Sequence, residues 1–254
     1  MRKMNKEELI KRGSKTARDG FSNEVDIAEK FNNWKEDKDA KEWLGIMGYK
    51  LNEIEKVEAV QVKGSYKTDV QVKITIYLKK VISPENISIK LVSNPNGFNQ
   101  IDKRWVDRYV ELWNIPSNVR KSLKLFTGEL PPARNDVRDK RRMFLDELDV
   151  TSREELLSFF RINKILVISD LIKGRGKLSA DWMLVVLKVG GVSKWVLKDI
   201  NQAMNILGKG KVSITAKGNL KIGNVGMQRK GGDNGRNSAK MLQFKINPII
   251  LFNE

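Results

Sequence analysis

The chain has 254 residues and a formal net charge of +17, from 48 Lys and Arg residues against 31 Asp and Glu residues. A protein this basic is expected to bind a polyphosphate, because each phosphate contact releases condensed counterions; the plain alternative is a solvated basic surface without function. Histidine and cysteine are both absent, which excludes Ser-His-Asp catalysis, a histidine base, Cys or His zinc sites and disulfides. If the chain cleaves phosphodiesters, it must use carboxylates and a metal ion, and a lysine is a candidate helper.

The ends and apolar runs of the chain predict its compartment. The N-terminal stretch MRKMNKEELIKRG lacks the apolar centre of a signal peptide, and the longest apolar runs, ILVI and WMLVVL, are too short to cross a membrane. We therefore expect a cytoplasmic protein without a membrane partner. The stretches GRGKLS (174–179) and GKGKVS (208–213) lack the leading glycine of a phosphate loop, and no GxGxxG occurs; the sequence predicts no nucleotide site of these kinds.

The first predicted element is a helix over 22–34, SNEVDIAEKFNNW, with apolar residues spaced three and four apart. We expect Ser22 to cap its N-terminus after a turn at Gly20. Glu24 lies on the apolar face of this helix. It is either a first-turn partner of the helix dipole or an acid that points toward a site.

Strands follow the first helix. Residues 57–63 alternate and predict a strand, and 70–78 show a clear period of two. Pro84 is expected to break the chain before another alternating strand, NISIKLV (86–92). In that strand the isoleucines and Leu91 share one face, which leaves the serine and lysine on the other face.

The second half of the chain alternates between helices, loops and short strands. The stretch SNPNGFNQ predicts a loop, 103–114 a helix, 127–142 a basic loop and 150–161 a helix capped near Thr151 or Ser152. The apolar run 164–172 predicts a buried strand. The remaining expectations are strands in DWMLVVLKV and KWVLKDI around a turn at Gly190 and Gly191, a short helix over 200–207, and short strands with glycine turns in the last fifty residues.

A candidate metal site lies in the strand region. Asp69 comes just before one strand, and Ser88 and Lys90 share a face of a later one, so the three can converge at the open end of a hairpin. The backbone carbonyl of Ile89 can supply a further oxygen to a metal ion. The spacing alone is weak, since an ordinary hairpin with a stray lysine also fits. Ser88 is a poor ligand beside a carboxylate, and Glu24 can replace the missing charge.

Several long strings make the chain recognisable. They include GSKTARDGFSNEVDIAEKFNNWKE, SYKTDVQV, IKLVSNPNGFNQIDKRW, FTGELPP, DKRRMF, KGRG and MQRKGGDNGRNSAKMLQFKI. By these strings the chain resembles the HinP-type type II restriction endonucleases, MspI-like relatives in the PD-(D/E)xK nuclease superfamily.

The resemblance implies an α/β fold with a restriction-endonuclease-like PD-(D/E)xK core, a mixed β-sheet flanked by helices and a β-rich C-terminal DNA-recognition part. It implies one domain over 1–254, with 1–125 mostly catalytic and 126–254 mostly for DNA recognition. It also implies Mg²⁺-dependent hydrolysis of double-stranded DNA at a short palindrome, GCGC, with Asp69 as metal ligand and Lys90 as catalytic lysine. Relatives carry an amide where this chain has Ser88, which leaves the role of Ser88 open.

Two loops carry the expected DNA contacts. In QRKGGDNGR, glycines let the backbone approach a groove, and donors and acceptors can meet base edges; a solvated Asp-Asn-Gly turn is the alternative. In NGFNQ, the resemblance implies that Phe98 inserts between base pairs while Gln100 fills the space of a displaced base. The expected DNA-binding residues are Phe98, Asn99, Gln100, Lys103, Gln228, Arg229, Lys230, Asp233, Asn234 and Arg236.

Further basic residues are candidate phosphate contacts, with a solvated face as the alternative for each. They are Lys103, Arg104, Arg138, Lys140, Arg141 and Arg142. By resemblance we expect a monomer or weak back-to-back dimer in a bacterial cytoplasm, with a cognate DNA methyltransferase. The rival hypotheses are a catalytically weak or inactive DNA-binding protein on a nuclease fold, motivated by Ser88, and a nuclease of the same fold with another DNA target.

Overall fold

The period-two pattern predicted over 70–78 forms β2 (Val70–Ile76), an inner strand of a mixed sheet, while its residues 77 and 78 lie outside the described part of the chain. The computed structural model describes residues 6–64, 67–76, 81–94, 96–231 and 236–253. The chain divides into two compact units. The first unit comprises Met1–Gly97, Ile172–Ala203 and Pro248–Glu254, and the second comprises Phe98–Leu171 and Met204–Asn247.

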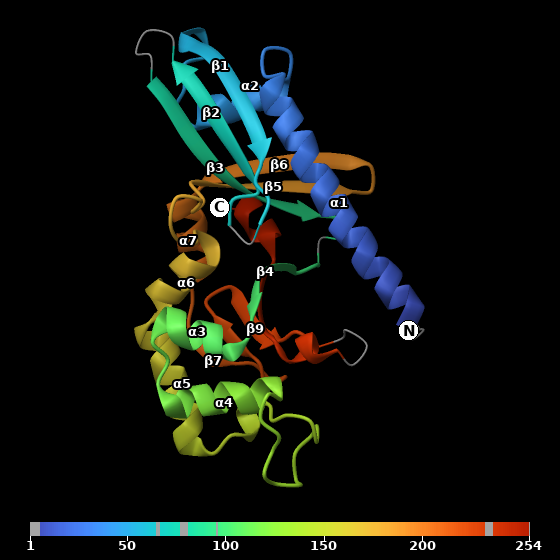
Figure 1. The fold of residues 1–254 in the computed structure, drawn as a ribbon, viewed down its shortest axis with the longest axis vertical. Coiled ribbons are helices and arrows are strands. Elements are labelled where there is room, and N and C mark those ends of the chain that lie inside the picture. Colours follow the sequence, from blue (N-terminus) through green and yellow to red (C-terminus); the bar gives the residue numbers. More distant parts are fainter. Residues whose placement is uncertain (1–5, 65–66, 77–80, 95, 232–235, 254) are drawn as a thin grey trace. The chain divides into compact units, whose positions relative to one another are not determined.

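The first unit contains a five-stranded sheet in the order β1-β2-β3-β5-β6, in which β3 and β5 are parallel and the other pairs antiparallel. Helix α1 runs along β1, β2 and β3 (Figure 1). The elements are α1 (Lys6–Asn32), α2 (Lys38–Ile46), β1 (Ile54–Gln61), β2 (Val70–Ile76), β3 (Val81–Val92), β5 (Trp182–Val189) and β6 (Val192–Asp199), with 3-10 turns at Leu51–Glu53 and Pro248–Phe252.

The core of the first unit lies between the two helices and the sheet. Phe31 of α1 and Trp43 of α2 are buried, with ring centroids 5.1 Å apart, and they pack with Val70 and Val72 of β2. Burial of side chains this large, at about 25 cal/mol per Å² of apolar surface, dominates the stability of such a sandwich. The packing fixes which face of β2 points inward, so the residues that follow the opposite alternation point away from the helices.

Two expectations for the first unit are wrong. Helix α1 begins at Lys6, so Gly20 is not a turn and Ser22 is not its N-cap; one interior glycine costs only about 1 kcal/mol, too little to end a long helix. Pro84 does not break the chain but lies within β3, opposite Lys73. In the described sheet β3 pairs with β5 from Ile87 onward, so the proline occupies a stretch with an open edge, where no ladder hydrogen bond is lost.

The hairpin of β5 and β6 confirms the predicted glycine turn. Gly190 and Gly191 have φ of 58° and 79°, the left-handed values that a two-residue turn between antiparallel strands requires. Helix α7 (Ile200–Gly208) follows β6, as predicted, and continues into the second unit.

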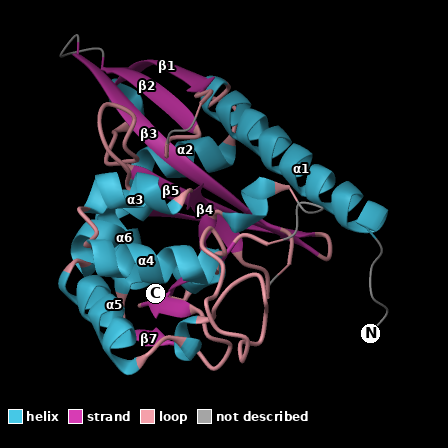
Figure 2. Ribbon diagram, turned by 60° about the horizontal axis from the view of Figure 1, so that its bottom comes forward, coloured by secondary structure: helices cyan, strands magenta, loops and turns pink. Residues whose placement is uncertain are grey.

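The second unit holds an antiparallel sheet in the order β4-β10-β9-β8-β7, with helices packed against it (Figure 2). It confirms the predicted β-rich C-terminal part. Its elements are β4 (Asn99–Arg104), α3 (Val106–Trp113), α4 (Ser117–Thr127), α5 (Val150–Ile162), α6 (Lys164–Ile172), β7 (Val212–Ile214), β8 (Leu220–Ile222), β9 (Val225–Arg229) and β10 (Leu242–Ile246), with 3-10 turns at Leu145–Glu147 and Asn237–Lys240.

The strand predicted over 164–172 is wrong, because this segment is helix α6. A short apolar run cannot separate a buried strand from a buried helix. On the helix, Val167 and Leu171 are buried one turn apart, while Ile165 is 86% exposed. The N-cap of α5 is also displaced from the predicted position: Asp149 accepts a hydrogen bond from the Ser152 backbone N–H at 2.9 Å. Among the described helices, none is both long and apolar enough for a membrane span.

Candidate active site and DNA-reading surface

Asp69 and Lys90 meet in the first unit, as predicted. The Nζ of Lys90 lies 3.2 Å from Oδ2 of Asp69, 3.0 Å from Oγ of Ser88 and 2.8 Å from the carbonyl oxygen of Ile89. The antiparallel register of β2 and β3 pairs Val70 with Ile87, which places the residue before β2 beside the middle of β3. The side chains of Lys90 and Asp69 keep 15% and 22% exposure, so the pair remains open to a substrate.

Backbone hydrogen bonds fix the Asp69 carboxylate. The Ile89 N–H donates to Oδ2 at 2.5 Å, and the Asp69 N–H donates to the Ile87 carbonyl at 2.9 Å. Just upstream, the buried Thr68 hydroxyl donates to the Leu178 carbonyl at 2.7 Å. The carboxylate therefore has a defined position before any ligand arrives, which preorganises an electrostatic site.

The loop that contains Leu178, the hydrogen-bond partner of Thr68, requires a glycine at position 174. Gly174 has φ of 80°, and a Cβ there would approach Cγ of Lys67 to 2.4 Å. Only glycine combines this left-handed backbone with such a close approach. Gly174 is the first glycine of the KGRG string. That this glycine lies beside the segment before Asp69 follows only from the fold.

Glu24 joins this site through a residue that sequence reasoning missed. Nε2 of Gln61, the last residue of β1, donates to Oε2 of Glu24 at 2.6 Å. Burial raises the pKa of Glu24, and repulsion from Asp69 raises it further. The hydrogen bond from Gln61 and the positive charge of Lys90 lower this pKa but do not cancel the increase. Glu24 thus interacts electrostatically with both Asp69 and Lys90. Gln61 carries no motif; its position beside Val70 in the register of β1 and β2 reveals its role.

The oxygen atoms around Lys90 suit a hard divalent cation. The ammonium group of Lys90 contacts a carboxylate, a hydroxyl and a backbone carbonyl, the oxygen types that Mg²⁺ accepts as ligands. In the part of the chain that the structure describes, no group of three or more Asp, Glu, His or Cys residues is placed to bind a metal. An ion here would need the Ile89 carbonyl and water in addition to Asp69.

Half of the expected DNA-reading residues lie on the sheet of the second unit. Strand β4 carries Asn99, Gln100 and Lys103, and β9 carries Gln228 and ends at Arg229. Phe98 is 59% exposed just before β4. Lys230 follows β9, Arg236 is exposed, and Asp233 and Asn234 lie outside the described residues.

A groove of about 560 Å³ in the second unit joins Phe98 to Gln228 and to Lys245 of β10. Lys245 is half-buried, and its burial lowers the pKa of its ammonium group. A desolvated cation gains from an anionic or acceptor-rich partner. Sequence reasoning missed Lys245, because within QFKI it resembles an outward residue of a strand.

Arginines gather around one acid in the same unit. Arg141 binds both carboxylate oxygens of Asp139 at 2.9 Å and holds the pKa of that carboxyl at about 2. Burial lowers the guanidinium pKa of Arg142, and repulsion from Arg229 lowers it further. Burial likewise lowers the guanidinium pKa of Arg229, and repulsion from Arg141 adds to that decrease. One carboxylate among three guanidinium groups leaves excess positive charge that a phosphate or guanine edge can neutralise.

The other candidate phosphate contacts differ in their surroundings. Arg138 pairs with Asp146 and Glu147, so its charge is already balanced. Arg104 turns inward, with Asp102 at 3.2 Å and Asp170 at 3.9 Å, which disfavours the predicted phosphate role. Lys140 and Lys103 are exposed.

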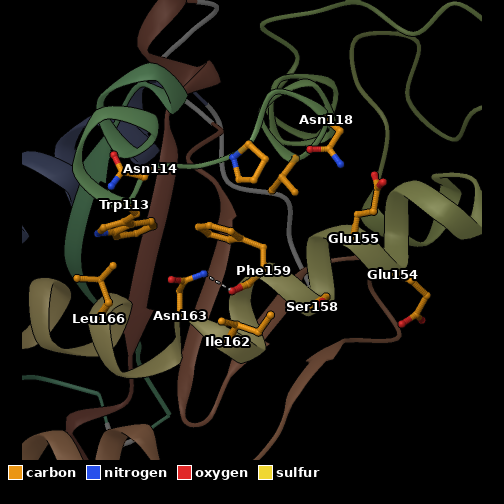
Figure 3. Close-up of a pocket in the computed structure, with 12 residues that line it drawn as sticks. Trp113, Asn114, Asn118, Glu154, Glu155, Ser158, Phe159, Ile162, Asn163 and Leu166 are labelled. Atoms are coloured by element: carbon orange, nitrogen blue, oxygen red, sulfur yellow. Dashed lines mark hydrogen bonds between the residues drawn. The ribbon is translucent and has the colours of Figure 1, made fainter.

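A hollow of about 700 Å³ elsewhere in the second unit contains none of the candidate residues. Trp113, Phe159 and Ile162 line it, with Asn163 donating to the Phe159 carbonyl at 2.9 Å (Figure 3). Glu154 and Glu155 also border it. Carboxylates at such a rim repel phosphates, which disfavours DNA binding in this hollow.

Two comparisons with known proteins give a match, one with a solved structure and one with a family model. The chain is similar to a solved crystal structure of restriction endonuclease MspI in complex with its cognate DNA, with a TM-score of 0.64, 15% sequence identity and coverage of 93% of this chain and 92% of that chain. This likeness confirms the predicted α/β restriction-endonuclease fold. A comparison with curated protein sequences gives no match. A family model described as R.HinP1I restriction endonuclease matches residues 47–252. The chain therefore belongs to the R.HinP1I restriction endonuclease family and is a type II site-specific deoxyribonuclease.

Proposed function

We propose that this endonuclease hydrolyses double-stranded DNA at GCGC with Mg²⁺, leaving 3′-hydroxyl and 5′-phosphate ends with short 5′ overhangs. The observation that carries the hydrolytic part is the contact of Lys90 with Asp69, Ser88 and Ile89 within 3.2 Å. The GCGC word comes from the resemblance, and a GC-only word agrees with the arginines and amides of the reading surface.

Asp69 and the Ile89 carbonyl would hold Mg²⁺, which when bound lowers the pKa of a ligated water and neutralises phosphate charge. Lys90 orients the attacking water and donates to the phosphate oxygens as negative charge develops. Ile89 also keeps the carboxylate in place through its N–H. The chain has no histidine, so a proton of the water would pass to solvent, to a phosphate oxygen or to a nearby carboxylate such as Glu24.

Ser88 and Glu24 share the role that an acid or amide fills in other sites of this kind. The Ser88 hydroxyl lies 3.3 Å from Asp69 Oδ2 and accepts from Lys90, so it orients both groups or a bridging water. Glu24, held by Gln61, adds a second negative charge near the site. We infer that Glu24 helps to attract the metal ion where the short Ser88 cannot reach it.

The reading surface is proposed to contact base edges through Asn99, Gln100, Gln228, Arg229, Lys230, Asp233, Asn234 and Arg236, with Phe98 as the wedge. Lys103 and the arginines near Asp139 supply phosphate contacts. Arg229 suits guanine, because a guanidinium group can donate to both O6 and N7. Residues 1–125 would act mostly in catalysis and 126–254 mostly in recognition.

We also propose how the enzyme acts in its host. One active site per chain implies that a monomer nicks one strand per binding event, or that a weak back-to-back dimer forms. A cognate DNA methyltransferase would protect the host sequence, and both enzymes would act in a bacterial cytoplasm.

Plasmid digestion tests the proposal against its rivals. Protein and Mg²⁺ should give discrete bands whose sequenced ends fall on one palindrome. Retarded but intact plasmid would support an inactive DNA-binding protein, the rival that Ser88 favours. Cut ends without a common sequence would support a nuclease with another DNA target.

A further inference from the structure

Three glutamine side chains form one hydrogen-bonded row across the sheet of the second unit. Nε2 of Gln228 on β9 donates to Oε1 of Gln243 on β10 at 3.2 Å, and Nε2 of Gln243 donates to Oε1 of Gln100 on β4. Strand β10 lies between β9 and β4, so Gln243 is the middle member. We call Gln100, Gln243 and Gln228 the amide row.

The strand register explains why the row forms. Gln243 lies directly opposite Gln228. On the other side the register shifts between Phe244 and Lys245, and Gln243 reaches Gln100 diagonally. Diagonal neighbours across a sheet lie within reach of long side chains. Gln243 is 6% exposed, whereas Gln100 is exposed and Gln228 lines the groove that also holds Phe98.

The row couples the orientations of its members. Turning the Gln243 amide alone would set its N–H groups against those of Gln228 and its oxygen against that of Gln100. Both hydrogen bonds would then be lost at a buried position, which is unfavourable. The three amides can therefore turn only together. The structure leaves the amine of Gln100 at one end of the row and the carbonyl oxygen of Gln228 at the other.

We propose that Gln243 is a positioning residue for base recognition, which holds Gln100 as a hydrogen-bond donor and Gln228 as an acceptor. A single glutamine fits either kind of base edge, because its amide can rotate. The row removes the independence of the two ends: whenever Gln100 presents its amide N–H, as in the structure, Gln228 presents its carbonyl oxygen. The surface then selects DNA that offers an acceptor, such as a guanine edge, to Gln100, and an exocyclic amine, such as that of cytosine, to Gln228. This inference depends on the proposed contact of Gln100 and Gln228 with DNA.

The variant Gln243→Met tests the row, since methionine has a similar length and cannot orient either neighbour. The assay measures kcat/KM on the cognate duplex and on every duplex with one base pair changed. We expect discrimination to fall by at least about tenfold at the base pairs read by Gln100 or Gln228, within the range that one base contact contributes, and to stay unchanged at the others. A purely structural defect would lower cleavage of all duplexes alike. Gln202→Met, at an exposed glutamine of α7, is the matched control.

The variant Gln243→Glu provides a second test if Gln243→Met does not fold. An ionised carboxylate only accepts, so Gln100 must turn its carbonyl outward while Gln228 keeps its orientation. At alkaline pH the base preference should change at the Gln100 contact alone. An unchanged preference at every base pair in the folded variants would overturn the proposal. A wild-type protein that neither cuts nor prefers any sequence would instead contradict the proposed function.

Discussion

Replacing Lys90 with methionine isolates the contribution of one ammonium group. The substitution keeps most of the aliphatic stem and removes the nitrogen that contacts Asp69, Ser88 and Ile89 within 3.2 Å. Asp69 keeps the Ile89 N–H and the Ser88 hydroxyl as donors. The carboxylate is therefore not left without hydrogen bonds, which limits the damage to the fold.

Two magnitudes follow from this geometry. The ion pair is only partly exposed, at 15% and 22%, so its loss should cost about 1 kcal/mol of unfolding free energy, near the upper end for exposed pairs and below the cost for fully buried ones. This corresponds to roughly 2–4 °C in Tm. In the reaction, loss of a donor that stabilises developing negative charge should lower the cleavage rate about 10²- to 10³-fold.

Three measurements separate these effects. Single-turnover cleavage of a labelled duplex gives the rate, fluorescence anisotropy gives the Kd for DNA, and a thermal scan gives Tm. We expect Kd to change by less than about tenfold, because at most one phosphate contact is removed. The control is Lys194→Met, at an exposed lysine of β6, and it should cleave at the normal rate. A folded Lys90→Met protein that cleaves within tenfold of wild type would refute the assigned role.

The other predictions concern the neighbours of Lys90 and the reading surface. Ser88→Ala removes two hydrogen bonds to charged groups, one to Asp69 and one from Lys90, and a loss of about 1.5 kcal/mol should slow single-turnover cleavage roughly tenfold; a loss as large as that of Lys90→Met would contradict an orienting role. The fold raises the pKa of Glu24, so stability falls as pH rises through that pKa; Glu24→Gln should raise Tm at pH 8 and not at pH 4, and equal effects at both would count against this. Phe98 is 59% exposed, so Phe98→Ala should change stability by less than about 0.5 kcal/mol, yet abolish base unstacking measured by 2-aminopurine fluorescence; unchanged fluorescence would eliminate the wedge.

The shared face of Ser88 and Lys90 could be predicted because alternation is a local property, whereas the approach of Asp69 depends on the pairing of β2 with β3. A period of two places Ser88 and Lys90 on one face of their strand, whatever the rest of the fold does. The turn at Gly190 and Gly191 was predictable for the same reason, since only its two backbone conformations matter.

Residues whose role depends on distant partners could not be found in this way. Gln61 reaches Glu24 because β1 lies beside β2, and Gln243 bridges Gln228 and Gln100 because β10 lies between β9 and β4. Strand order is set by the whole fold, and no local sequence pattern at either glutamine reveals it. The strand predicted over 164–172 failed because burial on one face of a helix and burial of a strand demand the same apolar composition.

The most direct test of the central claim compares wild type with Asp69→Asn on one duplex that contains the mapped palindrome, over a titration of Mg²⁺. Asparagine keeps the shape of the side chain and removes the charge that would hold the ion. The wild type should cut at a rate that saturates with Mg²⁺ and leave 5′-phosphate ends, while Asp69→Asn should bind the duplex and leave it intact. Equal cleavage by both proteins, or cleavage by the wild type that needs no divalent ion, would contradict the account.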